Sequence, residues 1–184
     1  IGEFKGDLGD LKIEVSIDKK AKTISIKDRG IGMTSQEVKK YINQVAFSGA
    51  EEFVQKYKED DKNSGIIGHF GLGFYSSFMV AKTVQIKTKS YKKSKGCLWE
   101  CDGSPKFSLN DVEKKDRGTE VILFVSDDAT EFLEDSKISL LLNKYCKFLP
   151  VEIKFGTNKK TEKNKKGKEI ELEQDNIINN TDPL

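Results

Sequence analysis

Hydrophobic and polar residues alternate between residues 11 and 28, and this period of two limits the segment to extended structure. Two alternating runs flank the polar segment 18–22, which is the pattern of a β-hairpin with one half-buried face. Similar short segments recur later, so the sequence predicts a sheet built largely from hairpins. The alternating residues are Leu11, Ile13, Val15, Ile17, Ile24 and Ile26, and the later strands are expected at 83–89, 97–101, 106–109, 120–125 and 151–155.

Helical patterns are interspersed with these strands. Thr34 followed by Glu37 has the spacing of a capping box, and an apolar stripe at helical spacing continues to Val45. Residues 74–80 and 131–148 predict two further helices, the first of them buried. Together these patterns indicate an α+β fold, a two-layer sandwich in which a mainly antiparallel, mixed sheet carries helices on one face.

Composition limits the partners of the chain. The chain has 184 residues and a formal net charge of +2, so we expect no long-range attraction to nucleic acid or to an acidic membrane. No apolar run approaches the roughly 20 residues of a membrane helix, and residues 1–6 do not resemble a signal peptide. An odd, sparse set of 3 cysteines favours a reducing compartment, so we expect a cytoplasmic protein. A zinc site at Cys97 and Cys101 stays open as an alternative, although no second ligand pair follows.

The composition changes after Gly156. Lysine dominates residues 159–168, and acidic residues dominate 169–175. Such charge runs are typical of solvated segments, so the sequence predicts a charged linker over 156–175 that is not part of a core. Residues 1–155 are therefore expected to form the folded domain.

The first candidate site lies in residues 28–33, DRGIGM. If the preceding strand continues, Asp28 falls on the same face as Ile24 and Ile26, at the end of an apolar row. A carboxylate there is costly without hydrogen-bond donors, and the exocyclic amine of adenine would supply one. Gly30 and Gly32 would let the backbone bend and a flat ring approach. The alternative is an ordinary turn in which Asp28 accepts bonds from local backbone.

The second candidate is a glycine-rich loop that leads into a helix. Gly68, Gly71 and Gly73 would let backbone N–H groups face an anion, and a helix N-terminus adds partial positive charge. The spacing is neither that of the P-loop nor that of the dinucleotide fingerprint. A structural hinge is the alternative. A third feature, residues 117–119 (RGT) before a strand, carries little information alone.

Taken in this order, the three motifs resemble the GHKL ATPases, which include the heat-shock ninety chaperones, gyrase-type topoisomerases, mismatch-repair proteins and histidine kinases. The amino-acid sequences of residues 28–34, 46–49 and 68–80 are similar to those of the heat-shock ninety family, and in particular to its bacterial branch, with a Bacteroidetes-like source. The resemblance covers about residues 4–155. It implies a GHKL (Bergerat) ATP-binding domain of a chaperone that assists protein folding in the heat-shock response through nucleotide-driven lid closure and homodimerisation.

The resemblance also implies roles for single residues. Asp28 would accept from the adenine amino group, with Gly30 and Gly32 giving the base room. Residues 48–68 would form a lid over the nucleotide, and unfolded client proteins would bind elsewhere in the intact chain. Further implied contacts are Met33 packing on the base, Thr119 in the water network beside Asp28, and backbone N–H groups of the loop Gly68, Gly71, Gly73 and Phe74 on the phosphates of ATP or ADP.

Three departures from the family pattern matter. Phe47 stands where many members have a phosphate-contacting lysine, and Tyr41 where many have a ribose-contacting asparagine. The family's catalytic Glu and Mg²⁺-binding Asn lie on a helix before the DxGxG motif, and residues 1–10 contain no such helix. We therefore expect an N-terminally truncated ATPase domain, with no catalytic or metal residue assigned and with poor hydrolysis. Residues 176–184 resemble the start of the middle domain.

Two other function classes stay open at this point. The chain could belong to another GHKL enzyme, such as a histidine kinase or a DNA-repair or topoisomerase ATPase. Its single histidine, His69, lies within the glycine loop, which favours a structural role over phosphorylation. A non-enzymatic nucleic-acid module would use the lysine run after Gly156, but that run lacks interleaved aromatic residues for base stacking.

Overall fold

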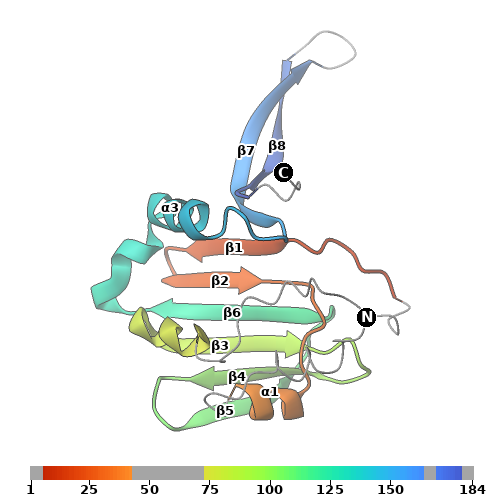
Figure 1. The fold of residues 1–184 in the computed structure, drawn as a ribbon, viewed down its shortest axis with the longest axis vertical. Helices are drawn as coiled ribbons and strands as arrows, with labels where there is room; N and C mark the ends of the chain where they lie inside the picture. Colours follow the sequence, from red (N-terminus) through yellow and green to blue (C-terminus); the bar gives the residue numbers. More distant parts are fainter. Residues whose placement is uncertain (1–5, 43–72, 164–168, 180–184) are drawn as a thin grey trace.

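An eight-stranded mixed sheet organises the part of the chain that the computed structural model describes, residues 6–42, 73–163 and 169–179. The strand order is β5-β4-β3-β6-β2-β1-β7-β8 (Figure 1). Every neighbouring pair is antiparallel except β1 and β7, which are parallel. The strands are β1 Ile13–Asp18, β2 Thr23–Lys27, β3 Ala81–Lys89, β4 Gly96–Cys101, β5 Phe107–Val112, β6 Gly118–Val125, β7 Ile153–Lys163 and β8 Glu169–Ile177.

The predicted hairpin at residues 11–28 is confirmed as β1 and β2. Asp18 closes its turn, because Oδ1 of that side chain accepts the N–H groups of Lys20 at 2.9 Å and Ala21 at 2.8 Å. Lys22 completes the turn with a positive φ of 53°. The carboxylate at the end of the first strand thus supplies the acceptor that the tight reversal needs.

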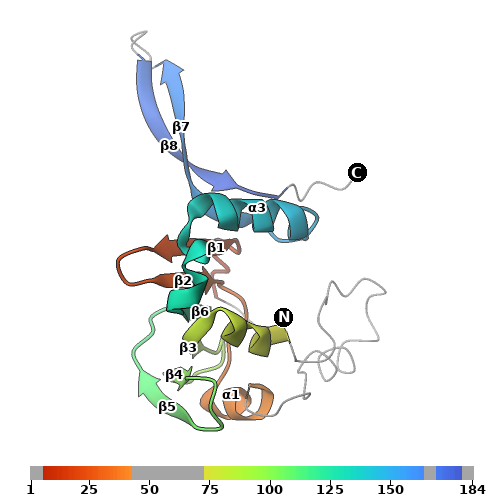
Figure 2. The ribbon, with the colours of Figure 1, turned by 90° about the vertical axis from the view of Figure 1, so that its left-hand side faces the viewer.

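The helices lie on one face of the sheet (Figure 2), as the sandwich prediction requires. They are α1 Ser35–Tyr41, α3 Asp135–Tyr145 and two 3₁₀ helices, η1 Gly73–Met79 and η2 Asp127–Leu133. The capping box before α1 is present as expected. None of the helices in the described part of the chain is long and apolar enough to cross a membrane.

Two helix predictions are wrong in detail. The helix expected at 131–148 is divided, because Glu134 has the extended angles φ −89° and ψ 125° between η2 and α3. The helix expected at 74–80 is a 3₁₀ helix without a fully buried residue. Ser76 and Ser77 each donate a hydroxyl bond of 2.6 Å to the carbonyl three residues earlier, which suits the tighter helix.

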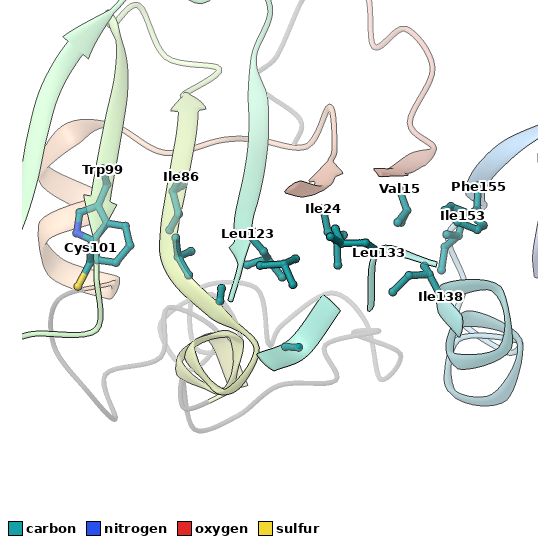
Figure 3. Close-up of a cluster of buried hydrophobic side chains, with 14 of the residues drawn as sticks. Val15, Ile24, Ile86, Trp99, Cys101, Leu123, Leu133, Ile138, Ile153 and Phe155 are labelled. Carbon is teal, nitrogen blue, oxygen red and sulfur yellow. The ribbon is translucent and has the colours of Figure 1, made fainter. Parts of the chain in front are cut away.

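The core lies between the sheet and the helices (Figure 3). Inward-facing side chains of successive strands form one layer, and Leu133 of η2 and Ile138 of α3 cover part of it. Trp99 on β4 is the largest fully buried side chain, at 2% exposure, and packs edge-on against Phe74 with 5.5 Å between ring centroids. The strand residues labelled in this layer are Val15, Ile24, Ile86, Trp99, Cys101, Leu123, Ile153 and Phe155.

Within the range 156–175, where the sequence predicts a solvated linker, the described residues 156–163 and 169–175 belong to strands. β7 continues to Lys163 and pairs with β8 in a hairpin that projects beyond the sheet (Figure 1). The register places Lys159 opposite Glu173, and opposite charges across strands favour pairing. A charged segment can therefore form a strand when its partner strand supplies the opposite charge.

Buried Asn179 holds the end of β8 against the sheet. Its Oδ1 accepts the N–H of Ile153 at 2.7 Å, and its Nδ2 donates to the carbonyls of Leu149 at 2.9 Å and Val151 at 2.7 Å. The first residues of the range 176–184 thus bond to the preceding domain. The division into a domain at 1–155, a linker at 156–175 and the start of a middle domain at 176–184 stays a prediction.

Candidate functional site

A row of polar side chains crosses the sheet where β2 ends and β6 begins. Thr119 on β6 pairs with Thr88 on β3, and the N–H of Asp28 donates to the carbonyl of Thr119 at 2.8 Å. Side chains of directly paired residues share one face of a sheet. Asp28, Thr119 and Thr88 therefore lie side by side, next to an apolar row that contains Ile26 and Ile86. The structure places Asp28 where the parity of the strand predicts it.

The Asp28 carboxylate accepts two backbone hydrogen bonds. Its Oδ1 receives the N–H of Gly30 at 2.7 Å and the N–H of Thr119 at 3.3 Å. The first bond closes a local turn, so the ordinary-turn alternative describes part of the geometry. The second bond ties that turn to β6, which a local turn alone does not require. Asp28 is half-buried, and Ile26 beside it is 38% exposed, so this end of the sheet face is open.

Thr88 links residues 28–33, which we call the glycine-containing turn, to the sheet. This threonine is fully buried, and its Oγ1 accepts the N–H of Met33 at 3.0 Å. The same oxygen lies 2.9 Å from Thr119 Oγ1 and 3.2 Å from the Gly118 carbonyl. Sequence reasoning missed Thr88. Its signal was a hydroxyl residue in phase with the apolar Val84 and Ile86 of the same strand.

Two glycines allow three backbone segments to meet at this point. Gly32 has a φ of 60°, and a Cβ built on it would lie 1.9 Å from the carbonyl oxygen of Lys89. Gly118 has a φ of 108°, and its Cβ would lie 2.2 Å from the carbonyl oxygen of Asp28. A larger residue at either position would force the chains apart as well as strain the backbone. Gly32 is therefore required by packing against β3.

Glu37 joins the start of α1 to the loop between β3 and β4. Its Oε2 accepts the N–H of Thr34 at 2.7 Å, and its Oε1 accepts from Lys92 Nζ at 2.8 Å. Burial raises the pKa of Glu37, but the hydrogen bonds from Lys92 and Thr34 outweigh burial and hold that pKa below its ordinary value. The N–H of Tyr91 also donates to the carbonyl of Ile31 at 2.8 Å. The turn, α1 and the loop thus form one connected unit.

The predicted phosphate loop is only partly described. Gly68 and Gly71 lie outside the described residues, as do the expected lid at 48–68, Phe47 and His69. Gly73 begins η1, where a Cβ would meet no atom within 4 Å. The side chain of Phe74 packs on Trp99. The structure therefore brings together Asp28, Gly30, Gly32, Met33 and Thr119, whereas Gly73 and Phe74 belong to a separate element on the same face of the sheet (Figure 2).

The described residues do not assemble a metal site. Within 6–42, 73–163 and 169–179 no group of three His, Cys, Asp or Glu side chains could hold a metal ion. Cys97 and Cys101 are free and buried on β4, and burial raises the pKa of the Cys97 thiol. Cys101 Sγ accepts the N–H of Gly103 at 3.3 Å. The two thiols are therefore packed within the structure, and nothing among the described residues supports the zinc alternative.

Comparison with known proteins agrees with this geometry. The family model "Histidine kinase-, DNA gyrase B-, and HSP90-like ATPase" matches residues 5–130. Proteins named chaperone protein HtpG are 58% identical to the chain in Bacteroides fragilis, 59% in Bacteroides thetaiotaomicron and 51% in Porphyromonas gingivalis. Each match covers 100% of the chain, which spans 26% of the length of these relatives. The resemblance to the bacterial branch of the heat-shock ninety family is confirmed.

Proposed function

Because the chain belongs to the family of histidine kinase-, DNA gyrase B- and HSP90-like ATPases, we propose that it binds ATP and ADP as the nucleotide-binding part of an ATP-dependent chaperone. The observation that carries the proposal is the position of Asp28. Its carboxylate lies at the open end of an apolar sheet face, where the backbone N–H of Thr119 on β6 donates a hydrogen bond to it. An adenine ring on that face would meet apolar side chains below and an acceptor for its amino group at the edge.

The contacts around Asp28 suggest how the base would be held. Both backbone bonds use Oδ1, so we assign Oδ2 to the adenine amino group. Thr119 would help to hold ordered water beside it, since its hydroxyl already belongs to the Thr88 network. Gly32 and Met33 would form the wall that the ring approaches, with Met33 fixed through its backbone. Strand pairing fixes Thr119, and hydrogen bonds to Thr119 and Thr88 fix Asp28 and Met33, so the site is preorganised and the cost of binding is lower.

The phosphates would lie toward η1. We propose that backbone N–H groups of Gly68, Gly71, Gly73 and Phe74 receive them, with residues 48–68 as a lid. Two described features support this assignment: η1 lies on the helix-bearing face of the sheet (Figure 2), and a Cβ built on Gly73 would meet none of the described atoms within 4 Å. The Phe74 ring packs on Trp99, which would hold the start of the element in place.

Magnesium would accompany the nucleotide in the intact protein. The described residues do not fit a Mg²⁺ site, because they contain no cluster of carboxylate ligands suited to it. No described residue is therefore assigned to the metal or to the hydrolytic step. ATP hydrolysis, Mg²⁺ binding, homodimerisation and binding of unfolded client proteins are proposed for the intact chaperone, which we place in the cytoplasm, away from nucleic acid and membranes.

Calorimetric titration with ADP tests the proposal. The wild-type chain should bind ADP, and Asp28→Asn should weaken binding by about 10- to 100-fold, because a charge-assisted hydrogen bond is lost. Asp128→Asn is the matched control, since Asp128 is an exposed carboxylate on η2. Circular dichroism would confirm that each variant is folded. Unchanged affinity in Asp28→Asn would remove Asp28 from the site, and a folded wild-type chain that does not bind ADP would refute nucleotide binding.

A further inference from the structure

A strongly basic pocket of about 660 Å³ lies at the edge of the sheet beside the glycine-containing turn. Four segments form it: Asp7, Arg29 after β2, residues 89–95 from the last residue of β3 onward, and residues 115–117 before β6. Among its described lining residues are seven lysines and arginines, two aspartates, two serines and one tyrosine. We call this concavity the basic pocket. Apart from the stems of lysine and arginine and the ring of Tyr91, its described lining is polar, which favours a hydrophilic occupant.

The basic pocket is separate from the polar row that holds Asp28. Thr88 faces the helices, so Lys89, the next residue on the strand, points to the other face. Lys89 pairs with Gly118, and a Cβ on Gly118 would lie 2.8 Å from Arg29 Cα. The missing side chain at Gly118 thus lets Arg29 and Lys89 reach the same concavity. The two sites share one turn but use opposite sides of it.

The positive charge in the basic pocket is only partly compensated. Lys92 pairs with Glu37 at 2.8 Å and Lys95 with Asp111 at 3.4 Å, but Lys89 Nζ donates to the neutral carbonyl of Lys115 at 3.1 Å. The guanidinium of Arg117 donates to the backbone carbonyls of Asp7 and Leu8. Arg29 pairs with Asp116 at 3.7 Å, whereas Lys89, Lys93 and Lys115 form no ion pair with a carboxylate of the described residues, so lysines exceed carboxylates in the basic pocket. The excess favours a multivalent anion.

Two buried polar atoms point to the same place. Within the described residues, Arg29 Nε and Ser94 Oγ are the only buried side-chain nitrogen or oxygen atoms without a hydrogen-bond partner. Both residues line the basic pocket. A buried donor without a partner costs free energy, so such atoms are rare unless a ligand or water satisfies them. Their coincidence in one cationic concavity favours a polar occupant there, either ordered water or a ligand.

We propose that the basic pocket binds a condensed phosphate, a compact anion of at least three charges. The Arg29 guanidinium and the Ser94 hydroxyl both donate to phosphate oxygens, and the surrounding lysines supply point charges. The volume is in the range of small-molecule sites. An acidic peptide fits less well, because its carboxylates are spread along an extended backbone, whereas the cations of the basic pocket converge on one concavity. This site goes beyond the nucleotide site proposed above and does not depend on it.

Calorimetric titration of the wild-type chain with sodium tripolyphosphate, at constant ionic strength, tests the proposal. Lys93→Gln/Lys115→Gln removes two exposed charges from the pocket and should weaken binding at least about tenfold. Arg29→Gln should do the same through the buried donor. Lys19→Gln/Lys137→Gln changes the net charge equally, in the β1–β2 turn and on α3, and should alter affinity less than about twofold if binding is local.

Two further titrations separate the pocket from other binding modes. Tripolyphosphate affinity should stay within about twofold in saturating ADP, and ADP affinity should stay unchanged in Lys93→Gln/Lys115→Gln. Loss of tripolyphosphate binding in ADP would place the anion at the nucleotide phosphates and overturn the proposal, while leaving nucleotide binding intact. The proposal also fails if the folded wild-type chain does not bind tripolyphosphate, if all variants bind equally, or if a hexaglutamate peptide binds the pocket more tightly.

Discussion

Replacing Thr88 by valine tests how much the Thr88 hydroxyl, which holds the glycine-containing turn on the sheet, contributes to the free energy of unfolding. Valine has nearly the same shape, so the substitution opens no cavity, but it removes the acceptor of the Met33 N–H and the partner of Thr119 Oγ1. An unsatisfied polar group costs about 1–3 kcal/mol when buried. Met33 and Thr119 are half-buried, so hydrogen bonds to water can offset part of this cost. The added methyl group of valine contributes up to about 0.8 kcal/mol of stability. We expect a loss of about 1–2 kcal/mol in the free energy of unfolding.

Urea unfolding followed by far-ultraviolet circular dichroism measures this loss. The transition midpoint should fall in Thr88→Val without a change in slope, because the surface exposed on unfolding is the same. Thr83→Val is the control, since Thr83 lies on the same strand, at the position of opposite parity, and is partly exposed. Its free energy of unfolding should change by less than about 0.5 kcal/mol.

Equal stability of Thr88→Val and Thr83→Val would refute the inference that the Thr88 hydroxyl fixes Met33. Hydrogen exchange adds a local measurement. The Met33 amide should exchange faster in Thr88→Val relative to amides in the middle of β3, because its acceptor is gone. A general loss of stability without selective exposure of Met33 would also contradict the proposed role.

Three further predictions concern the same region and the thiols. Gly32→Ala should lower the free energy of unfolding in urea by more than about 2 kcal/mol, because its Cβ would overlap the Lys89 carbonyl at a positive φ. The control variant Gly73→Ala should be nearly neutral. Equal effects of the two variants would contradict the packing argument. The pKa of Glu37 is lowered in the fold, so its contribution to the free energy of unfolding is present above the ordinary pKa of glutamate and is lost as pH falls through the lowered pKa of the folded state. The difference in urea midpoint between wild type and Glu37→Gln should therefore shrink on acidification, and a constant difference would count against the Lys92 pairing. In the native chain a thiol reagent should modify half-buried Cys146 well before Cys97, which is fully buried. The Cys146→Ser variant should lose the fast phase of the reaction. Rapid reaction of Cys97 would contradict its burial.

Local sequence signals predicted the elements that local contacts determine. The β1–β2 hairpin follows from alternation around a turn that Asp18 closes, and the start of α1 follows from the Thr34–Glu37 pair. The position of Asp28 at the end of an apolar row follows from strand parity alone. Each of these signals lies within a few residues of the feature that it specifies.

Features that depend on distant pairing could not be predicted in the same way. Thr88 matters because β3 pairs with β6 in a register that places it beside Thr119, and no local pattern gives that register. The basic pocket combines Arg29 with residues far along the chain, so its charges are not adjacent in sequence. The segment of the β7–β8 hairpin was predicted to be a linker because charge runs usually indicate solvation, whereas in the structure the two strands pair and Lys159 lies opposite Glu173.

The parallel pairing of β1 with β7 has a consequence for synthesis on the ribosome. Ile13 pairs with Ile153, so one side of β1 has no strand partner until the second half of the domain has been made. At about 5–20 residues per second, that interval is roughly 7 to 30 seconds. During it, the nascent β1–β2 hairpin presents an open backbone edge, which is a template for wrong pairing. The nascent domain would thus need protection until β7 emerges and covers that edge.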